Sequence, residues 1–397
     1  MATSIALVGI GGYGNFYLKA LLNAAPEREI TLMAGIDPYP ERSGLYAELQ
    51  ERGIPVYPDL HTFYQHTCAD LVIISAPIHL HAPLTSLALS KGSHVLCEKP
   101  LGASVEDARL MLEAEQRAGK PVAIGYQWSY SDAILALKRD ILAGRFGKPL
   151  HLKSMALWPR GLSYYQRNDW AARLKTPEGA WVLDSPVNNA TAHYLHNMLF
   201  LLGDRMDTSA APLSLEAELY RANAIENYDT AAMRVVTAAC PDLLFITAHP
   251  VNSYRGPVMH YAFENAVIEY PAEEGGFRAT FKDGTVQEYG NPEDTHANKI
   301  WAAVESARNG VPLVCGIRTA IPQLACALAA QETEIHTFPP ERVEVMDTGS
   351  DQLTYIPGLF EDLVTAYEAN KMPFEMGMAW AKSAGKVEVG EMGLMEG

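Results

Sequence analysis

The sequence predicts an α/β domain with a doubly wound parallel sheet, followed by an α+β domain with a large, mostly antiparallel open sheet. Three observations indicate this. Over residues 1–125, short β-branched runs alternate with segments of helical spacing, as strands and helices do around a parallel sheet. A glycine-rich turn follows the first run. From about residue 150 onward, several runs read like strands of an antiparallel sheet.

In the first domain, apolar runs rich in β-branched residues and bounded by turn residues are typical of strands buried on both faces. These runs are residues 4–10, 30–37, 69–77, 93–98 and 121–126. The segments between them predict helices within 9–25, 40–53, 81–92 and 104–119. In the last of these, Ser104 is the expected N-cap, with Glu106 and Asp107 in the first turn.

The glycine-rich turn fits the pattern G-x-G-x-x-G between a predicted strand and a predicted helix. In this motif the first glycine allows a tight turn, the second lets the backbone approach a pyrophosphate, and the third lets helix and strand pack closely. The phosphates then lie at a helix N-terminus. The residues expected to bind the cofactor here are Gly9, Gly11, Gly12, Tyr13 and Gly14.

An acidic residue ends the second predicted strand, as the motif requires for the ribose. Asp37 follows Gly14 by 23 positions, about where an acid binds the ribose hydroxyls. A carboxylate there repels a 2′-phosphate, so the sequence favours NAD over NADP. Because Arg42 is close in sequence, NADP is also possible.

Two polar segments follow strands of this domain, at the sheet edge where ligands bind in such folds. One runs from Ala76 to His81, and the other is the run Glu98-Lys99-Pro100. Taken alone, the second segment is an ordinary solvated turn. Beside a bound nicotinamide, however, Lys99 could steer a substrate hydroxyl and lower its pKa. Glu98 would then orient Lys99 or contact the cofactor ribose.

Residues 69–111 resemble the glucose–fructose oxidoreductase/inositol dehydrogenase (Gfo/Idh/MocA) family. The resemblance rests on markers that occur in the family's order: Pro77, His81, Gly92, Val95, Glu98, Lys99 and Pro100. It implies an NAD(P)-dependent oxidoreductase acting on an alcohol, with Lys99 as a catalytic and substrate-binding residue. It also implies cofactor contacts from Ala76, Pro77, His81 and Glu98, and no metal. The histidines show no metal-ligand spacing.

The family's second signature is a glycine-rich segment, then an aspartate, then a histidine four residues later on a helix. Within residues 176–203 this register places the histidine at His193 and puts Asn189 where the acid is expected. Asp184 lies nine positions before His193, so either Asp184 or Asn189 fills the acidic role. We expect Asn189, His193 and His196 to share one helical face. His193 is the expected general base, since imidazole suits proton transfer near neutral pH.

Aromatic and amide side chains outside these motifs are candidates for substrate binding. Gln127 and Trp128 lie in one aromatic run, and Trp170 lies in a loop that resembles the family's variable substrate segment. Packing is an equally good explanation for the run that contains Trp128. With Lys99, Asn189 and His193, these residues complete the expected substrate site.

The expected domains are residues 1–125 for the dinucleotide, 126–345 for substrate and oligomerisation, and 346–397 as an extension with an amphipathic helix. The net charge of -16 argues against nucleic-acid or membrane-surface binding. Five scattered cysteines and the absence of a secretory pattern in the printed sequence favour a cytoplasmic protein. The family resemblance implies a homodimer or homotetramer assembled through the second domain's sheet.

These features predict an NAD(P)-dependent oxidoreductase that transfers a hydride between nicotinamide and a secondary alcohol of a sugar, sugar derivative or cyclitol. Two alternatives stay open. One is a glycoside hydrolase that uses transient oxidation with bound NAD on the same scaffold. The other is a non-catalytic protein that senses a dinucleotide, although such a protein does not need both Lys99 and His193.

Overall fold

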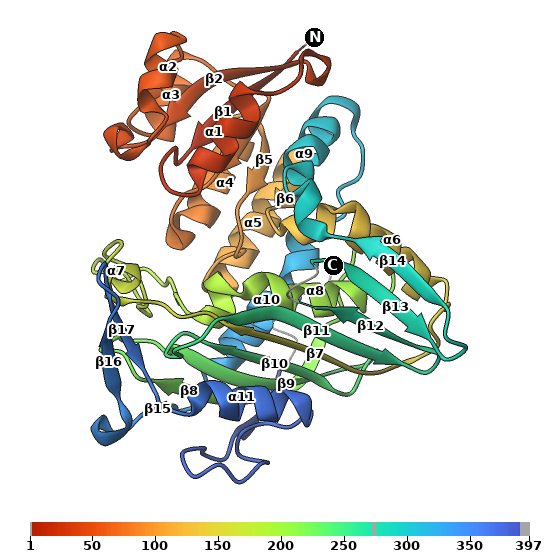
Figure 1. Ribbon diagram of the computed structural model, residues 1–397. Helices are drawn as coiled ribbons and strands as arrows, with labels where there is room; N and C mark the ends of the chain where they lie inside the picture. Colours follow the sequence, from red (N-terminus) through yellow and green to blue (C-terminus); the bar gives the residue numbers. More distant parts are fainter. Residues whose placement is uncertain (1, 272–274, 390–397) are drawn as a thin grey trace. The chain divides into compact units, whose positions relative to one another are not determined.

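The chain forms two compact units in a computed structural model, which describes residues 2–271 and 275–389 (Figure 1). One unit comprises the chain up to Tyr130 together with Thr295–Ala320. The other comprises Ser131–Asp294 and the chain from Ile321 onward. Each unit has its own sheet and its own buried core, so the two are described in turn.

The first unit is built on a parallel six-stranded sheet in the order β3-β2-β1-β4-β5-β6. Its strands are β1 (Thr3–Val8), β2 (Ile30–Ile36), β3 (Val56–Tyr57), β4 (Leu71–Ile74), β5 (His94–Cys97) and β6 (Val122–Ile124). The order reverses between β1 and β4, so the crevice at the carboxyl ends of these two strands is the expected ligand position. All five predicted strands and the doubly wound parallel sheet are confirmed.

Helices of this unit alternate with the strands, as predicted. They are α1 (Gly14–Leu22), α2 (Tyr46–Glu51), α3 (Leu60–His66), α4 (His81–Ser90), α5 (Val105–Ala118) and α9 (Asn298–Asn309). Ser104 caps α5 by accepting a hydrogen bond from the Asp107 N–H at 3.1 Å. The sequence analysis missed β3, which has only two residues, and α3, whose buried apolar face consists of Leu60 and Phe63.

The predicted first domain, residues 1–125, lacks a segment that lies far away in the sequence. Thr295–Ala320 also belongs to the first unit. In α9, Ile300, Ala303 and Val304 have the i, i+3, i+4 spacing of one helical face. All three are buried in the same core cluster as residues of β1, β4 and β5. This returning helix could not be assigned from local sequence, since amphipathic spacing does not identify the sheet against which a helix packs.

The second unit is built on a larger, mostly antiparallel sheet in the order β14-β13-β12-β11-β7-β10-β9-β8-β15, with β18 also paired to β8. Its strands are β7 (Pro149–Leu157), β8 (Pro212–Arg221), β9 (Thr230–Thr237), β10 (Leu243–Ala248), β11 (Arg255–Phe263), β12 (Ala266–Tyr270), β13 (Phe277–Phe281), β14 (Val286–Gly290), β15 (Ile335–Thr337) and β18 (Gly385–Glu388). Among the strand pairs described in this sheet, only β7–β10 and β8–β15 are parallel. The predicted hairpin is confirmed in β13–β14, where Gly284 turns the chain with a φ of 86°.

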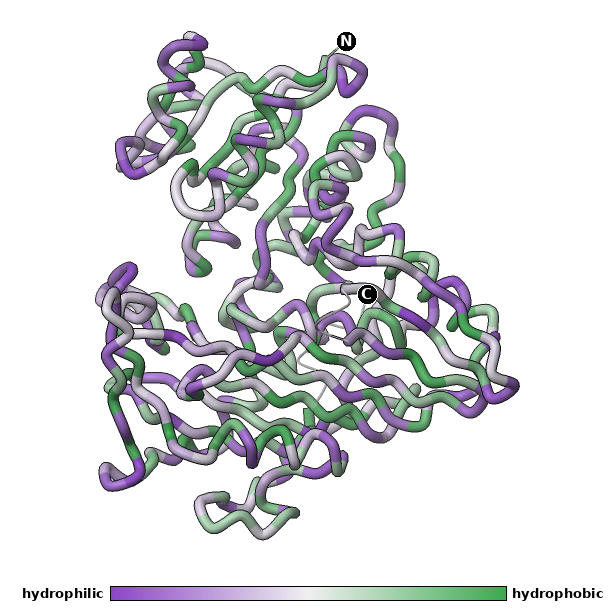
Figure 2. The backbone as a smooth tube through the Cα atoms, viewed as in Figure 1, coloured by the Kyte–Doolittle hydropathy of each residue, from purple (hydrophilic) through white to green (hydrophobic). Residues whose placement is uncertain are grey.

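Helices cover both faces of the second sheet. On one face lie α6 (Asp132–Leu142), α8 (Ala192–Leu201) and α10 (Ile317–Ala330), and on the other lies α11 (Leu359–Glu368) (Figure 1). A short helix, α7 (Leu162–Tyr165), and a small hairpin of β16 (Glu344–Asp347) and β17 (Gln352–Tyr355) complete the unit. Long apolar stretches of the chain coincide with its buried elements, such as α8 (Figure 2).

The C-terminal extension forms part of the second unit's core. Leu359 and Leu363 of α11 and Trp380 are buried in one cluster with Met155 and Ile246 of the sheet. The helix predicted in this segment is therefore confirmed, and its apolar face packs on β7 and β10. Residues 390–397 of the extension lie outside the described part of the chain. Among the helices described, none is long and apolar enough to cross a membrane.

Candidate active site

Two glycines of the G-x-G-x-x-G turn are required by packing in the first unit. Gly9 follows β1 with a φ of +78°, and a Cβ there would lie 2.2 Å from the carbonyl oxygen of Ser75, just after β4. A Cβ at Gly14 would lie 1.9 Å from the carbonyl oxygen of Gly9. Both contacts are too short for any side chain, so these glycines let β1, the segment after β4 and α1 come together at the switch point.

The other two glycines of the turn face open space. A Cβ at Gly11 or Gly12 would meet no described atom within 4 Å. The φ of +51° at Gly12 favours glycine by itself, whereas neither packing nor a positive φ explains the glycine at Gly11. Both precede α1, which has no acidic residue in its first turn. An open glycine backbone at a helix N-terminus fits a pyrophosphate, because amide N–H groups can approach the anion directly.

Asp37 follows β2 and is held against the glycine turn. Its Oδ2 accepts a hydrogen bond from the Ile10 N–H at 3.0 Å, and its Oδ1 accepts one from the Tyr39 N–H at 2.9 Å. A carboxylate offers about four acceptor positions, so two amide partners leave capacity for ribose hydroxyls. The guanidinium of Arg42 lies over the Tyr39 ring at 4.3 Å from its centroid.

His81 connects the two polar segments that follow β4 and β5. Its ring is buried, with Nε2 2.9 Å from the carbonyl oxygen of Ala76 and Nδ1 2.8 Å from that of Pro100. Burial lowers the pKa of His81 despite these two contacts. The side chain therefore acts as a clamp between the chain at Ala76-Pro77 and the turn at Lys99-Pro100.

Glu98 is a buried carboxylate with three donors of different kinds. Its Oε1 accepts hydrogen bonds from the Tyr17 hydroxyl at 2.5 Å and from the Lys299 ammonium, and its Oε2 accepts one from the Lys99 N–H at 3.0 Å. Burial by itself raises the pKa of Glu98, but the Lys299 charge and the hydrogen bonds from Lys299 and Tyr17 outweigh it, so the pKa lies below its ordinary value. The group is thus a sealed anion.

This arrangement fixes the backbone at Lys99 relative to the helix that follows the glycine turn. The Lys299 ammonium, fully buried, also donates to the Tyr13 hydroxyl at 3.0 Å. Tyr13 and Tyr17 flank the start of α1, so the network joins α1, α9 and the end of β5. Lys99 itself is half-buried and forms a cis peptide with Pro100. The sequence analysis missed Lys299 because it belongs to the helix that returns to this unit.

In the second unit, Asp184 and Asn189, the two alternatives for the acidic position, are hydrogen-bonded to each other. The Asp184 Oδ1 accepts from the Asn189 Nδ2 at 2.7 Å. The Asp184 Oδ2 accepts from Arg167 Nη2 at 2.7 Å and from the Ala172 N–H at 2.6 Å. Asp184 is 2% exposed, and these three donors compensate its burial. Asp184 and Asn189 therefore belong to one hydrogen-bonded group.

The expectation that Asn189, His193 and His196 share one helical face is wrong. Asn189 belongs to a π-helical turn, Pro186–Ala190, which is capped by the Ser185 side chain and ends at Thr191. His193 lies in the first turn of α8 and is partly exposed. His196 is buried against Phe200, and burial lowers its pKa to about 3. The π turn, with its five residues Pro186–Ala190, lies within the stretch that separates Asp184 from His193.

The predicted substrate residues divide between the two units. Gln127 and Trp128 lie in a 3-10 turn, Gln127–Tyr130, of the first unit, and Trp128 is only 1% exposed. Its burial favours the packing role for this residue. Trp170 is half-buried in the second unit, where the guanidinium of Arg167 lies 5.2 Å from its ring centroid.

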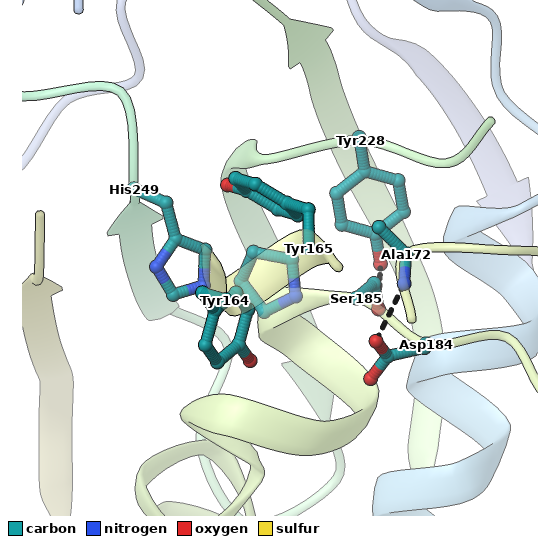
Figure 3. A pocket seen from close by; sticks show the side chains of 8 residues that line it. Tyr164, Tyr165, Ala172, Asp184, Ser185, Tyr228 and His249 are labelled. Atoms are coloured by element: carbon teal, nitrogen blue, oxygen red, sulfur yellow. Dashed lines mark hydrogen bonds between the residues drawn. The ribbon is translucent and has the colours of Figure 1, made fainter. Parts of the chain in front are cut away.

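A small pocket lies beside Asp184 in the second unit (Figure 3). Its walls are aromatic and polar, and the lining residues are Tyr164, Tyr165, Ala172, Asp184, Ser185, Pro186, Tyr228 and His249. The Ser185 hydroxyl donates to the Tyr228 hydroxyl at 3.1 Å. Within the described ranges, no group of three or more His, Cys, Asp or Glu side chains could hold a metal ion.

Comparisons with known proteins give the same assignment for the first unit. Residues 3–126 match the family model described as "Oxidoreductase family, NAD-binding Rossmann fold". Inositol 2-dehydrogenase of Salmonella paratyphi B is 32% identical over 153 residues, which is 38% of this chain and 44% of that protein. A 1-carboxy-3-chloro-3,4-dihydroxycyclohexa-1,5-diene dehydrogenase of Comamonas testosteroni is 29% identical over 199 residues, or 50% of this chain and 48% of that protein. The matches thus span less than half of each relative.

A solved structure extends the similarity of fold over most of the chain. The WlbA dehydrogenase of Bordetella pertussis, in complex with NADH and UDP-GlcNAcA, has a TM-score of 0.69 and 20% identity, covering 84% of this chain and 96% of that one. That likeness confirms the combination of a Rossmann domain and a mostly antiparallel second sheet. The match of residues 3–126 to the Gfo/Idh/MocA family model makes this part of the chain similar to that family's NAD-binding Rossmann fold.

Proposed function

We propose that this protein is an NAD-dependent oxidoreductase that acts on a CH–OH group of a sugar, sugar derivative or cyclitol. The observation that carries the proposal is the network around Glu98. It ties the backbone of Lys99 to the helix that follows the glycine turn, within the unit that matches the NAD-binding family. A solvated surface turn has no need of a fully buried lysine–glutamate pair behind it.

Oxidation of a secondary alcohol removes a hydride from carbon and a proton from oxygen. NAD, when bound, supplies the acceptor for the hydride. The chain must orient the alcohol and receive the proton. In this proposal the ammonium of Lys99 steers the hydroxyl and favours its ionisation, and His193 takes the proton as general base. Glu98 is a positioning residue, because it acts on the Lys99 backbone.

The cofactor assignment is supported by the open glycine turn and by Asp37 beside it. We expect NAD to bind more tightly than NADP, because the Asp37 carboxylate accepts ribose hydroxyls and repels a 2′-phosphate. Ala76 and Pro77 stay predicted cofactor contacts, whereas His81 and Glu98 are buried with their polar atoms already bonded and hold the segments at Ala76 and Lys99 in place. Calorimetric titration of the full chain with each dinucleotide measures the preference, and tighter binding of NADP would contradict the role given to Asp37.

The substrate class is supported by the relatives. Their names include inositol 2-dehydrogenase and a dihydroxycyclohexadiene dehydrogenase, and the WlbA structure holds UDP-GlcNAcA. We infer a ring compound with several hydroxyl groups.

One assay separates dehydrogenation from the redox-neutral alternatives. The full chain with NAD is offered sugars and cyclitols while NADH absorbance is followed, and aryl glycosides while release of the aryl group is followed. We expect net NADH from at least one polyol. Aryl-glycoside cleavage without net NADH would contradict the proposal in favour of the hydrolase. Tight dinucleotide binding with no turnover in either series would contradict it in favour of a sensor.

Self-association through the second sheet and a cytoplasmic location stay predictions. Because α11 and Trp380 pack against the sheet at Met155 and Ile246, that part of the sheet face is already covered by the chain itself. Any partner copy would have to use another part of the sheet. Light scattering of the full chain measures its oligomeric state.

A further inference from the structure

One aromatic side chain of the second unit is held in a stack and yet lies largely in solvent. Tyr254 is 66% exposed. Its ring is parallel to that of Trp158, with 6.1 Å between the two ring centroids and 5° between the two planes. That separation is within the range of about 4.5–7 Å that is typical of paired aromatic rings. The stack therefore fixes the orientation of the Tyr254 ring while most of the residue stays accessible.

The pairing of two neighbouring strands places this stack at the end of the sheet. Leu157, the last residue of β7, is opposite Arg255, the first residue of the antiparallel strand β11. Trp158 and Tyr254 are the next residues beyond this pair, so their rings meet just outside the ladder. The Trp158 ring N–H donates to the carbonyl oxygen of Gly256 at 3.1 Å, which ties the indole to β11. The fold thus sets the position of the exposed ring before any ligand arrives.

The stack also contacts the helix that carries the expected general base. The Trp158 ring packs edge-on against the ring of Tyr194, with 5.6 Å between the centroids. Tyr194 directly follows His193 in the first turn of α8, and His193 is partly exposed. The accessible ring of Tyr254 is therefore two ring contacts away from the residue next to His193. A substrate that reaches His193 has an aromatic surface close by.

Trp181 shows what distinguishes Tyr254 from another exposed aromatic side chain of the same unit. Trp181 is 47% exposed, but the ammonium of Lys175 lies 4.0 Å from the centroid of its ring. Among the residues that the structure describes, no cation lies over the ring of Tyr254. The chain thus occupies the Trp181 ring with its own lysine and leaves the Tyr254 ring to solvent.

An exposed aromatic ring in a fixed orientation suits the apolar face of a saturated ring. Contacts between its carbon atoms and C–H groups gain dispersion energy and remove apolar surface from water. A pyranose or cyclitol with mostly equatorial hydroxyls presents C–H groups on its faces and keeps its hydroxyls at the rim. Such a ring can lie flat on an aromatic side chain while its hydroxyls stay available to proton-transfer groups.

We infer that Tyr254 is a substrate-binding residue, on which the C–H face of the substrate ring stacks. This inference rests on the proposed function and specifies how its substrate is recognised: a cyclic polyol is bound through its ring face, whereas an open-chain polyol lacks such a face. The stacking contact is the same in the ground state and in the transition state. Tyr254 therefore contributes to KM and leaves kcat unaffected.

The test is calorimetric titration of the full chain, saturated with NAD, with cyclic polyols and an acyclic counterpart. The cyclic probes are scyllo-inositol, myo-inositol, D-glucose and D-galactose, and the acyclic one is D-glucitol. We expect at least one cyclic probe to bind about tenfold or more tightly than D-glucitol. Tyr254→Ala should weaken the binding of that probe by about 5- to 20-fold, which corresponds to about 1–2 kcal/mol, and leave D-glucitol unchanged. In steady-state NADH formation, KM should rise by the same factor at constant kcat.

Two matched variants sharpen the result. Tyr254→Phe keeps the ring and loses only the hydroxyl, so it should retain the affinity of the unaltered chain. Phe374→Ala removes an aromatic side chain that is 49% exposed in the C-terminal segment, and it should change neither binding nor KM. Thermal unfolding confirms that each variant folds. Because Tyr254 is exposed, its substitution should leave the unfolding temperature nearly unchanged.

Four results would overturn the inference: no measurable binding of any cyclic probe, equal binding of the cyclic probes and D-glucitol, an unchanged affinity in Tyr254→Ala, or equal losses in Tyr254→Ala and Tyr254→Phe. The last result would assign the binding to the hydroxyl. Titration with uridine is a further control, and binding tighter than that of every cyclic polyol, lost in Tyr254→Ala, would assign the ring to a nucleobase instead.

NADH formation decides the proposed function separately. Binding of a cyclic polyol that depends on Tyr254, without NADH formation from any alcohol, would leave the stacking site and remove the dehydrogenase. NADH formation from a cyclic polyol with the same KM in Tyr254→Ala would leave the dehydrogenase and remove the stacking site.

Discussion

Glu98 in the first unit and Asp184 in the second are buried carboxylates with the same kinds of partner. Each accepts from one cationic side chain, one neutral side chain and one backbone N–H: Lys299, Tyr17 and the Lys99 amide for Glu98, and Arg167, Asn189 and the Ala172 amide for Asp184. They differ in their cations. The Lys299 side chain is 0% exposed, whereas that of Arg167 is 26% exposed.

This difference indicates two uses for one local arrangement. At Glu98 the ion pair is sealed, so its charges hold the fold and fix the Lys99 backbone. At Asp184 the pair borders a pocket with aromatic walls, lined by Tyr164, Tyr165 and Tyr228. A third buried carboxylate, Glu218 of β8, accepts from the Tyr220 hydroxyl and the Phe374 N–H, and no cation is among its hydrogen-bond partners in the described part of the chain. These three groups give a graded series.

The largest expected effect is on stability, from breaking the sealed pair. Lys299→Met should lower the free energy of unfolding by about 3–5 kcal/mol, because it leaves the Glu98 charge buried without its cation. Urea denaturation of the full chain measures it. In the double variant with Glu98→Gln, the loss should be smaller than the sum of the two single losses. A loss below about 1 kcal/mol in Lys299→Met would show that the pair is not sealed in solution.

The second expected effect is on catalysis, from the pair at the pocket. Asp184→Ala should lower kcat/KM for the best substrate of the polyol screen, with a loss of transition-state stabilisation of about 2–3 kcal/mol. The reason is that the substitution removes the acceptor of three donors and leaves the charge of Arg167 without its carboxylate. Asn189→Ala removes one donor and should cost about 1 kcal/mol. The two losses should not add, because the side chains are hydrogen-bonded to each other. Equal, small and additive losses would contradict this reading of the site.

The smallest expected effect is a pH dependence at Glu218. Burial raises the pKa of Glu218 to about 7, above its ordinary 4.5, so between these values the folded chain holds a proton that the unfolded chain has lost. Stability should therefore fall as pH rises through this window. Glu218→Gln stays neutral, so its stability relative to the unaltered chain should rise by about 1–2 kcal/mol from pH 5 to pH 8.

Urea unfolding of the unaltered chain and the variant at both pH values measures this difference. Glu216→Gln, at a partly exposed position on the same strand, is the matched control and should show no such rise. A parallel pH dependence of the Glu218 variant and the unaltered chain would mean that Glu218 ionises normally in the fold.

Much of the first unit could be predicted because its signals are local. Strand runs, the glycine turn and Asp37 lie within one stretch of chain, and the packing of Gly9 and Gly14 gives the physical reason for their lack of side chains. Lys299 could not be predicted, because its importance arises only when α9 returns to this unit and brings it to Glu98, 201 residues earlier in the chain. No local pattern indicates which buried charge a distant helix will neutralise.

The second unit was predicted less well for a related reason. The strand pattern indicates the sheet, but the spacing of Asn189, His193 and His196 predicts that they share one helical face. A π turn ends at Thr191 instead, and it lets Asp184 and Asn189 meet.

The central claim is that Lys99 is a catalytic residue positioned by Glu98, and one variant tests it most directly. With the polyol that yields NADH, Lys99→Met should bind NAD with measurable affinity and lower kcat by about 100-fold or more, the effect of losing a positioned proton-transfer or electrostatic group. Steady-state NADH formation, alongside calorimetric titration with NAD, gives both values. Unchanged kcat with intact NAD binding would make the segment from Glu98 to Pro100 an ordinary turn and contradict the account.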